Sequence, residues 1–125
     1  MRESKLWSWH ILSGVVIAVL LGIHMAIMHM DAVLEILGIG SGDPIRSDAV
    51  FYRSRQLYFM ITYIILLAAA LFHGLYGLRS MLCELSLSRA LEKVIGTLCT
   101  AVGLVLFIYG SYVAMTVYRM GEVLP

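Results

Sequence analysis

One uninterrupted apolar segment decides the fold class of this chain: residues 57–82 read LYFMITYIILLAAALFHGLYGLRSML. Arg79, near the end of the segment, is its one formally charged residue. A helix needs roughly 20 predominantly apolar residues to cross the ~30 Å hydrocarbon core of a bilayer, and this segment is longer than that. We therefore predict a transmembrane helix over residues 57–82.

Two further apolar segments flank it, at about residues 7–30 and about residues 94–118, and both also reach spanning length. The first is too long for a secretory signal peptide and contains histidines, so we expect it to be retained. Residues 31–55 are rich in glycine and acidic residues, which predicts an outer loop with a short surface helix near residues 32–37. The second connection, about residues 83–93, is short and charged, so the second and third spans should be antiparallel neighbours.

The composition agrees with a membrane protein. Hydrophobic residues make up 61% of the 125 residues and charged residues 14%, whereas soluble domains carry about 25% charged residues. The formal net charge of +1 excludes a strongly basic surface for nucleic acid. We predict an all-α membrane protein of one domain over residues 1–125. Glycines are spread through the three spans and permit close helix contact, so we expect this thin bundle to form half of a larger helical bundle with a partner subunit.

Basic residues divide almost evenly between the two sides of the predicted spans. The side of the N-terminus has five of them and the opposite side four, a small excess that favours a cytoplasmic N-terminus. The first group is Arg2, Lys5, Arg79, Arg89 and Lys93, and the second is Arg46, Arg53, Arg55 and Arg119.

Two histidines lie deep inside predicted spans, where an ionisable side chain is a functional hypothesis by default. His24 lies ~17 residues into the first span, ~25 Å from its start, and therefore in the outer half of the membrane. His73 lies ~16 residues into the second span, which runs the opposite way, and therefore in the inner half. Neutral imidazole is a standard axial ligand of haem iron. We predict haem ligation by both residues; the alternative for each is a hydrogen-bonded packing residue.

The other two histidines lie closer to the predicted membrane surfaces. His10, beside Trp7 and Trp9, is interpreted as an interfacial residue that reaches toward water, with a place near a haem propionate or a quinone as the alternative. His29 follows His24 by five residues and points about 140° away around the helix. We interpret it as a surface or propionate-contacting residue and as the fallback ligand if His24 does not bind iron.

The residues after His73 read GLYGLR over positions 74–79. Gly77 is four residues from His73, on the same helix face, and a glycine there leaves room for a flat macrocycle. Arg79 lies closer to the inner surface, where it is expected either to contact a haem propionate or a quinone or to anchor the helix end. Tyr76 is also expected in the vicinity of a haem propionate or a quinone. No catalytic triad, phosphate loop or carboxylate pair is visible in the sequence.

Two stretches together, GIHMAIMH at residues 22–29 and HGLYGLR at residues 73–79, resemble the membrane-anchor subunits of succinate dehydrogenase and fumarate reductase. The likeness is to the small D-type anchor of prokaryotic enzymes with two anchors and two haems, and it covers most of the chain. It implies a multi-pass protein of the prokaryotic inner (cytoplasmic) membrane that binds a second anchor subunit, an iron–sulfur subunit and a flavoprotein subunit. Succinate or fumarate chemistry is then expected on another subunit and not on this chain.

The same resemblance implies haem b shared with the second anchor and quinone as substrate. His73 corresponds to the ligand of the haem nearer the iron–sulfur subunit, and His24 to the ligand of the haem nearer the opposite face. Some relatives carry an Asp-Tyr pair about twelve residues past the second-helix histidine, at the quinone site. Here that region reads Cys83-Glu84-Leu85, so no quinone role is carried over to it.

Two other functions are compatible with the sequence. One is a homodimeric cytochrome b electron carrier, in which each haem is held by equivalent histidines of two copies. The other is a haem-free structural anchor. The sequence leaves open the number of haems, one or two, and the direction of the reaction.

Overall fold

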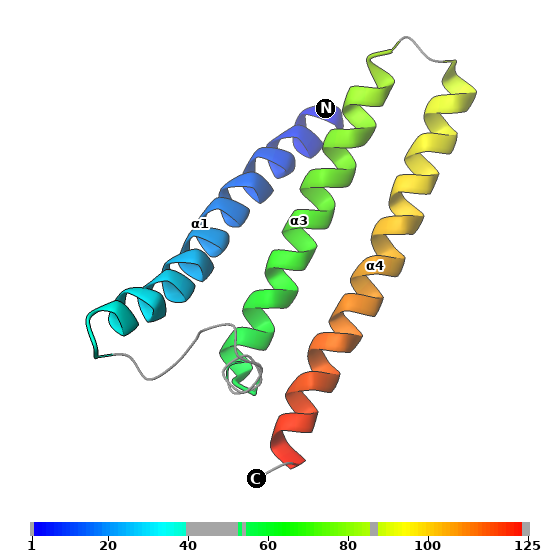
Figure 1. The fold of residues 1–125 in the computed structure, drawn as a ribbon. Coiled ribbons are helices and arrows are strands. Elements are labelled where there is room, and N and C mark those ends of the chain that lie inside the picture. The colour runs from blue at the N-terminus through cyan, green and yellow to red at the C-terminus, as the bar shows by residue number, and fades with distance from the viewer. Residues whose placement is uncertain (1, 40–52, 54, 86–87, 124–125) are drawn as a thin grey trace.

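The computed structural model describes residues 2–39, 53, 55–85 and 88–123 of the chain. These residues form three long helices, α1 (Arg2–Ile36), α3 (Leu57–Cys83) and α4 (Arg89–Val123), and no strand occurs among them. The all-helical fold predicted from the sequence is confirmed (Figure 1).

Each helix contains a stretch that is long and apolar enough to cross a membrane: Ser4–Leu34, Leu57–Cys83 and Arg89–Met120. The shortest helix, α3, has 27 residues, which corresponds to ~40 Å at 1.5 Å per residue and exceeds the ~30 Å hydrocarbon core. Helices are suited to the lipid interior because their backbone groups are hydrogen-bonded within the segment. The prediction of three transmembrane helices is therefore confirmed.

The helices extend beyond the apolar segments that predicted them. The predicted outer loop begins at Asp31, but α1 continues to Ile36, so the predicted surface helix near residues 32–37 is the last part of α1. Asp31 and Glu35 interrupt the apolar pattern of the sequence without ending the helix. Most of the predicted loop, residues 40–52 and 54, lies outside the described residues. α4 begins at Arg89, ahead of the predicted start at residue 94.

α3 is the central helix of the described structure. It packs against α1 on one side and against α4 on the other (Figure 1), and the predicted antiparallel pairing of the second and third spans is confirmed. Small residues permit the close contact with α4: a Cβ on Gly103 would lie 2.8 Å from Leu75 Cδ1, and one on Gly110 would lie 2.5 Å from Leu67 Cδ2. The leucine side chains therefore occupy the space that a larger residue would need.

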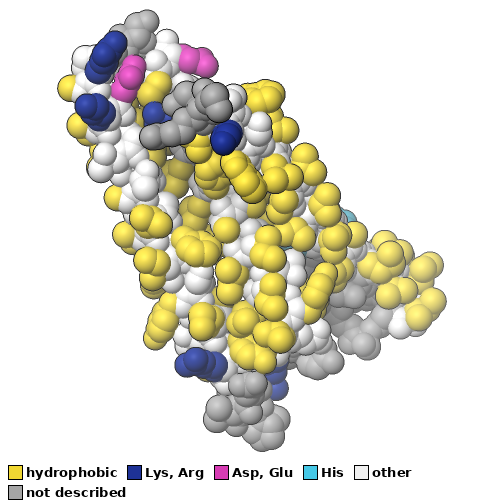
Figure 2. Space-filling view, turned by 180° about the vertical axis from the view of Figure 1, so that it is seen from behind, with side chains coloured by type: hydrophobic (Ala, Val, Ile, Leu, Met, Phe, Trp, Pro, Cys, Tyr) yellow, Lys and Arg dark blue, Asp and Glu magenta, His cyan; other side chains and the backbone are white. Residues whose placement is uncertain are grey.

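The described side chains include no buried hydrophobic residue. Apolar side chains cover the length of the helices, and charged ones gather toward their ends (Figure 2). A soluble protein would bury such surface, since exposed apolar patches of this extent mark membrane or protein contacts. Ser13, 8% exposed, is the one buried residue among those described, and it lies in the functional site.

Candidate functional site

Two histidines that are far apart in the sequence, His10 of α1 and His73 of α3, stack on one another. Their ring centroids are 4.1 Å apart and their planes differ by 10°. Both side chains are partly buried. His10 therefore lies at the depth of His73 and faces α3, whereas the sequence interpretation had it reaching toward water.

A glycine on the opposing helix makes room for each ring. A Cβ on Gly14 would lie 3.1 Å from His73 Cε1, and a Cβ on Gly77 would lie 3.3 Å from His10 Cε1. Each imidazole thus packs directly on the backbone of the neighbouring helix. The space beside Gly77, expected from the sequence to face a macrocycle, is filled here by the His10 ring.

Hydrogen bonds orient the ring of His73. Its Nδ1 lies 3.2 Å from the backbone oxygen of His10 and 3.4 Å from the hydroxyl oxygen of Ser13. The Ser13 hydroxyl donates to the same His10 oxygen at 2.7 Å. A carbonyl oxygen can only accept, so Nδ1 of His73 is the donor in this hydrogen bond. The ring is thereby oriented, and Nε2 is the nitrogen left for another partner.

His10 carries an unsatisfied polar atom. Its Nδ1 is buried and has no hydrogen-bond partner among the described residues. The ring of Tyr76 lies beside it, 5.1 Å between centroids and tilted by 45°. Of the residues predicted near the haem or quinone, the structure thus brings His10, Tyr76 and His73 together.

Sequence reasoning missed Ser13 and Gly14 as parts of this site. A signal for them was present, because Ser13 and Gly14 follow His10 by three and four residues and so share its helix face. What the sequence lacked was any indication that this face of α1 meets the face of α3 that carries His73.

The remaining two histidines lie toward the other end of α1. His24 follows His10 by 14 residues in the same helix, ~21 Å along the axis, and its ring contacts Tyr63 of α3 edge to face at 6.1 Å. His29 is exposed, and its Nδ1 donates to the backbone oxygen of Met25 at 2.9 Å. His24 and His73 are thus too far apart to bind one iron.

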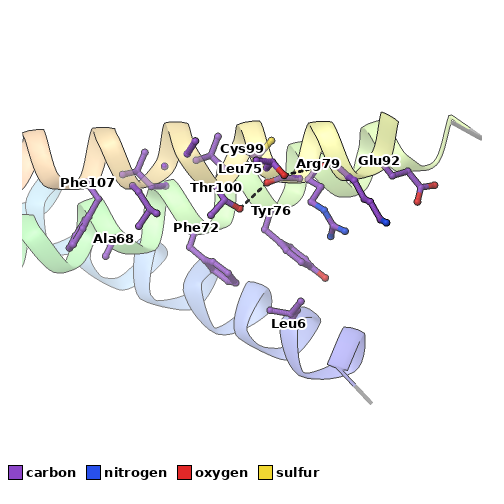
Figure 3. Close-up of a pocket in the computed structure, with 17 residues that line it drawn as sticks. Leu6, Ala68, Phe72, Leu75, Tyr76, Arg79, Glu92, Cys99, Thr100 and Phe107 are labelled. Atoms are coloured by element: carbon purple, nitrogen blue, oxygen red, sulfur yellow. Dashed lines mark hydrogen bonds between the residues drawn. The ribbon is translucent and has the colours of Figure 1, made fainter. Parts of the chain in front are cut away.

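Arg79 lies on another side of α3 from His73. Its guanidinium packs against α4, where a Cβ on Gly96 would lie 3.2 Å from Arg79 Nε. Together with Tyr76 it lines a groove of about 1070 Å³ between α3 and α4 (Figure 3). The structure therefore separates Arg79 from the histidine stack, although Arg79 and His73 belong to one short stretch of sequence, residues 73–79.

Comparisons with known proteins agree with this arrangement of helices. Residues 2–111 match the family model of the succinate dehydrogenase/fumarate reductase transmembrane subunit. The chain is also similar to a succinate dehydrogenase hydrophobic membrane anchor subunit of Archaeoglobus fulgidus, with 26% identity over 115 residues that cover 92% of this chain and 91% of that relative. No solved structure matches the chain. Because the family model covers most of the sequence, the chain belongs to the family of succinate dehydrogenase/fumarate reductase transmembrane subunits.

Proposed function

We propose that this membrane-anchor subunit binds haem b and passes electrons between the iron–sulfur clusters of its complex and quinone. It would hold a flavoprotein subunit and an iron–sulfur subunit on the membrane, together with a second anchor subunit that completes the helical bundle. Dicarboxylate chemistry then belongs to the flavoprotein, and quinone is the substrate at the membrane.

The hydrogen bond that orients His73 is the observation that carries the proposal. Histidines that bind metals almost always donate their second N–H to a backbone carbonyl or a carboxylate, which fixes the ring and raises its basicity. His73 has this partner in the His10 carbonyl, at 3.2 Å. An imidazole so prepared fits the axial position of haem iron, and the haem, when bound, supplies a one-electron carrier.

A second ligand of this haem would come from the other anchor subunit. The rings of His10 and His73 are stacked face to face with 4.1 Å between their centroids, which leaves no room for a haem between them. His10 would therefore not serve as the second ligand. Its unpartnered Nδ1 and the neighbouring Tyr76 are instead polar groups available near the edge of the haem or to quinone.

A second haem would use His24, toward the opposite membrane face. The ~21 Å that separate His24 from the level of His10 and His73 require a separate iron. His29 stays the fallback ligand, since its hydrogen bond to Met25 also leaves Nε2 for another partner. Arg79 is not included in either haem site, because its side chain is directed toward α4.

The membrane concerned is the prokaryotic cytoplasmic membrane, with the N-terminus on the cytoplasmic side. Among the described basic residues, four belong to the end of the bundle that carries the N-terminus (Lys5, Arg79, Arg89 and Lys93) and three to the opposite end (Arg53, Arg55 and Arg119). This distribution supports the orientation through the preference of basic residues for the cytoplasmic side.

The two stacked histidines permit a matched test of haem binding. The complex is purified with His73→Ala or with His10→Phe, and haem is measured against flavin from the dithionite-reduced spectrum. We expect His73→Ala to lose the haem nearer the N-terminal side. His10→Phe should retain it, because the variant keeps both the backbone carbonyl that orients His73 and a flat ring over Gly77.

Three results would contradict the proposal. If the reduced wild-type complex showed no b-type α-band, the chain would be interpreted as a haem-free structural anchor. Loss of haem in His10→Phe together with full retention in His73→Ala would transfer the ligand role to His10. Isolation of a haem protein without flavin or iron–sulfur subunits would favour the homodimeric carrier instead.

A further inference from the structure

The groove between α3 and α4 is a second feature, and Tyr76 is the residue that it shares with the proposed haem site. It opens on a different side of α3 from the histidine stack, since Arg79 follows His73 by six residues and the two point about 120° apart around the helix. Leu6 of α1 also lines it, close to the N-terminal end of the bundle (Figure 3).

The lining of the groove changes along its length. Arg79, Glu92 and Lys93 line the end nearest the α3–α4 connection, and the hydroxyls of Thr97 and Thr100 follow. Both hydroxyls donate to their own helix backbone, at 2.9 and 2.8 Å, so they present no free donor. Tyr76 and Cys99 also line the groove, and its other side chains are apolar, among them Ala68, Leu71, Phe72, Leu75, Leu104 and Phe107.

The length of the groove corresponds to about one leaflet. Phe107 follows Lys93 by 14 residues in α4, so the groove is ~21 Å long. One leaflet has a similar depth, because half of a ~30 Å hydrocarbon core is ~15 Å and the polar boundary region adds to it. A groove with one charged end and an apolar stretch of this length matches one lipid molecule whose head group lies at the membrane surface.

The charges at the polar end favour an anion. Arg79 and Lys93 face one carboxylate, Glu92, within the groove. Arg79 is half-buried against Gly96, so its guanidinium is held inside the groove. Basic pockets between transmembrane helices on the cytoplasmic side bind the head groups of anionic lipids. With a neutral quinone, Glu92 would balance one of the two cations and leave the other without a counter-charge.

The occupant that matches this lining combines one anionic group with an apolar chain. We propose that this groove binds an anionic phospholipid of the leaflet on the N-terminal side, with its phosphate at Arg79 and Lys93 and an acyl chain along Phe72, Leu75 and Phe107.

The test compares lipid retention by the purified complex. Complexes are incubated with vesicles of equal phosphatidylglycerol and phosphatidylcholine, re-isolated, and their bound lipids are counted by native mass spectrometry. We expect a preference for phosphatidylglycerol that falls about five-fold on loss of one charge in Arg79→Gln and about 25-fold in the double variant with Lys93→Gln. Arg89→Gln is the matched control, because Arg89 is exposed at the same membrane end and does not line the groove.

A second measurement locates the lipid without any substitution. Phosphatidylglycerol with a photoreactive acyl chain should crosslink to groove residues such as Thr100 in preference to Val105, which is 65% exposed on the same helix. Equal retention of the two lipids, an equal loss in Arg89→Gln, or uniform crosslinking along α4 would overturn the proposal. Haem content does not enter these readouts, so the haem proposal stands or fails separately.

Discussion

Replacing Gly14 by alanine tests the contact between α1 and His73 most directly. The added Cβ would lie 3.1 Å from His73 Cε1 and 3.3 Å from Nδ1, closer than ordinary van der Waals contact. The imidazole must move by a few tenths of an ångström, which disturbs its 3.2 Å hydrogen bond to the His10 carbonyl. Overpacking of this kind costs about 1–3 kcal/mol.

Gly22→Ala in the same helix is the matched control, since nothing lies within 4 Å of a Cβ there. Both substitutions restrict the unfolded chain and favour helix, a gain of about 0.4–1 kcal/mol. The difference between the two variants therefore isolates the steric cost at His73. We expect Gly22→Ala to be slightly more stable than the wild type, and Gly14→Ala to be less stable than Gly22→Ala by about 1–3 kcal/mol.

The measurements are the thermal unfolding midpoint of the purified complex and the electron paramagnetic resonance spectrum of the haem proposed to bind at His73. A cost of 1 kcal/mol corresponds to about 4 °C in the midpoint for a domain of this size. A displaced axial imidazole should also shift the haem g-values in Gly14→Ala alone. If the two variants were equal in stability and in spectrum, the packing of His73 against Gly14 would be refuted.

Three further predictions follow from the same geometry. Ser13→Ala removes the 2.7 Å hydrogen bond to the His10 carbonyl and should lower the free energy of unfolding by about 1 kcal/mol. A redox titration should show a shifted haem midpoint potential, which Ser13→Thr should restore. An unchanged potential would show that Ser13 does not act on the proposed ligand His73. His24→Ala should remove a second haem while His29→Ala leaves it, measured as haem per flavin, and the opposite result would transfer the outer ligand to His29. The Cys83 thiol, at the end of α3, should react with a membrane-impermeant maleimide in inside-out vesicles; reaction in right-side-out vesicles alone would reverse the proposed orientation.

Part of the histidine site was accessible to sequence reasoning. Depth follows from residue count along a helix, so the placement of His24 and His73 toward opposite ends of the bundle agrees with the arrangement of α1 and α3. The role of His10 did not follow, because its partner is 63 residues away. Arg79 was grouped with His73 by proximity in sequence, whereas six residues of helix turn the two side chains to different neighbours.

By itself, the sequence determined that three helices cross a membrane and that His24 and His73 lie at different depths. Apolar length and internal backbone hydrogen bonding are local properties, and they suffice to choose a spanning helix in lipid. Only the tertiary structure decided that His10 stacks on His73 over Gly14 and Gly77, and that Arg79 turns to α4. The physical reason is that lipid is as apolar as the side chains, so hydrophobicity does not choose the contact face; close packing at small residues and a few hydrogen bonds choose it.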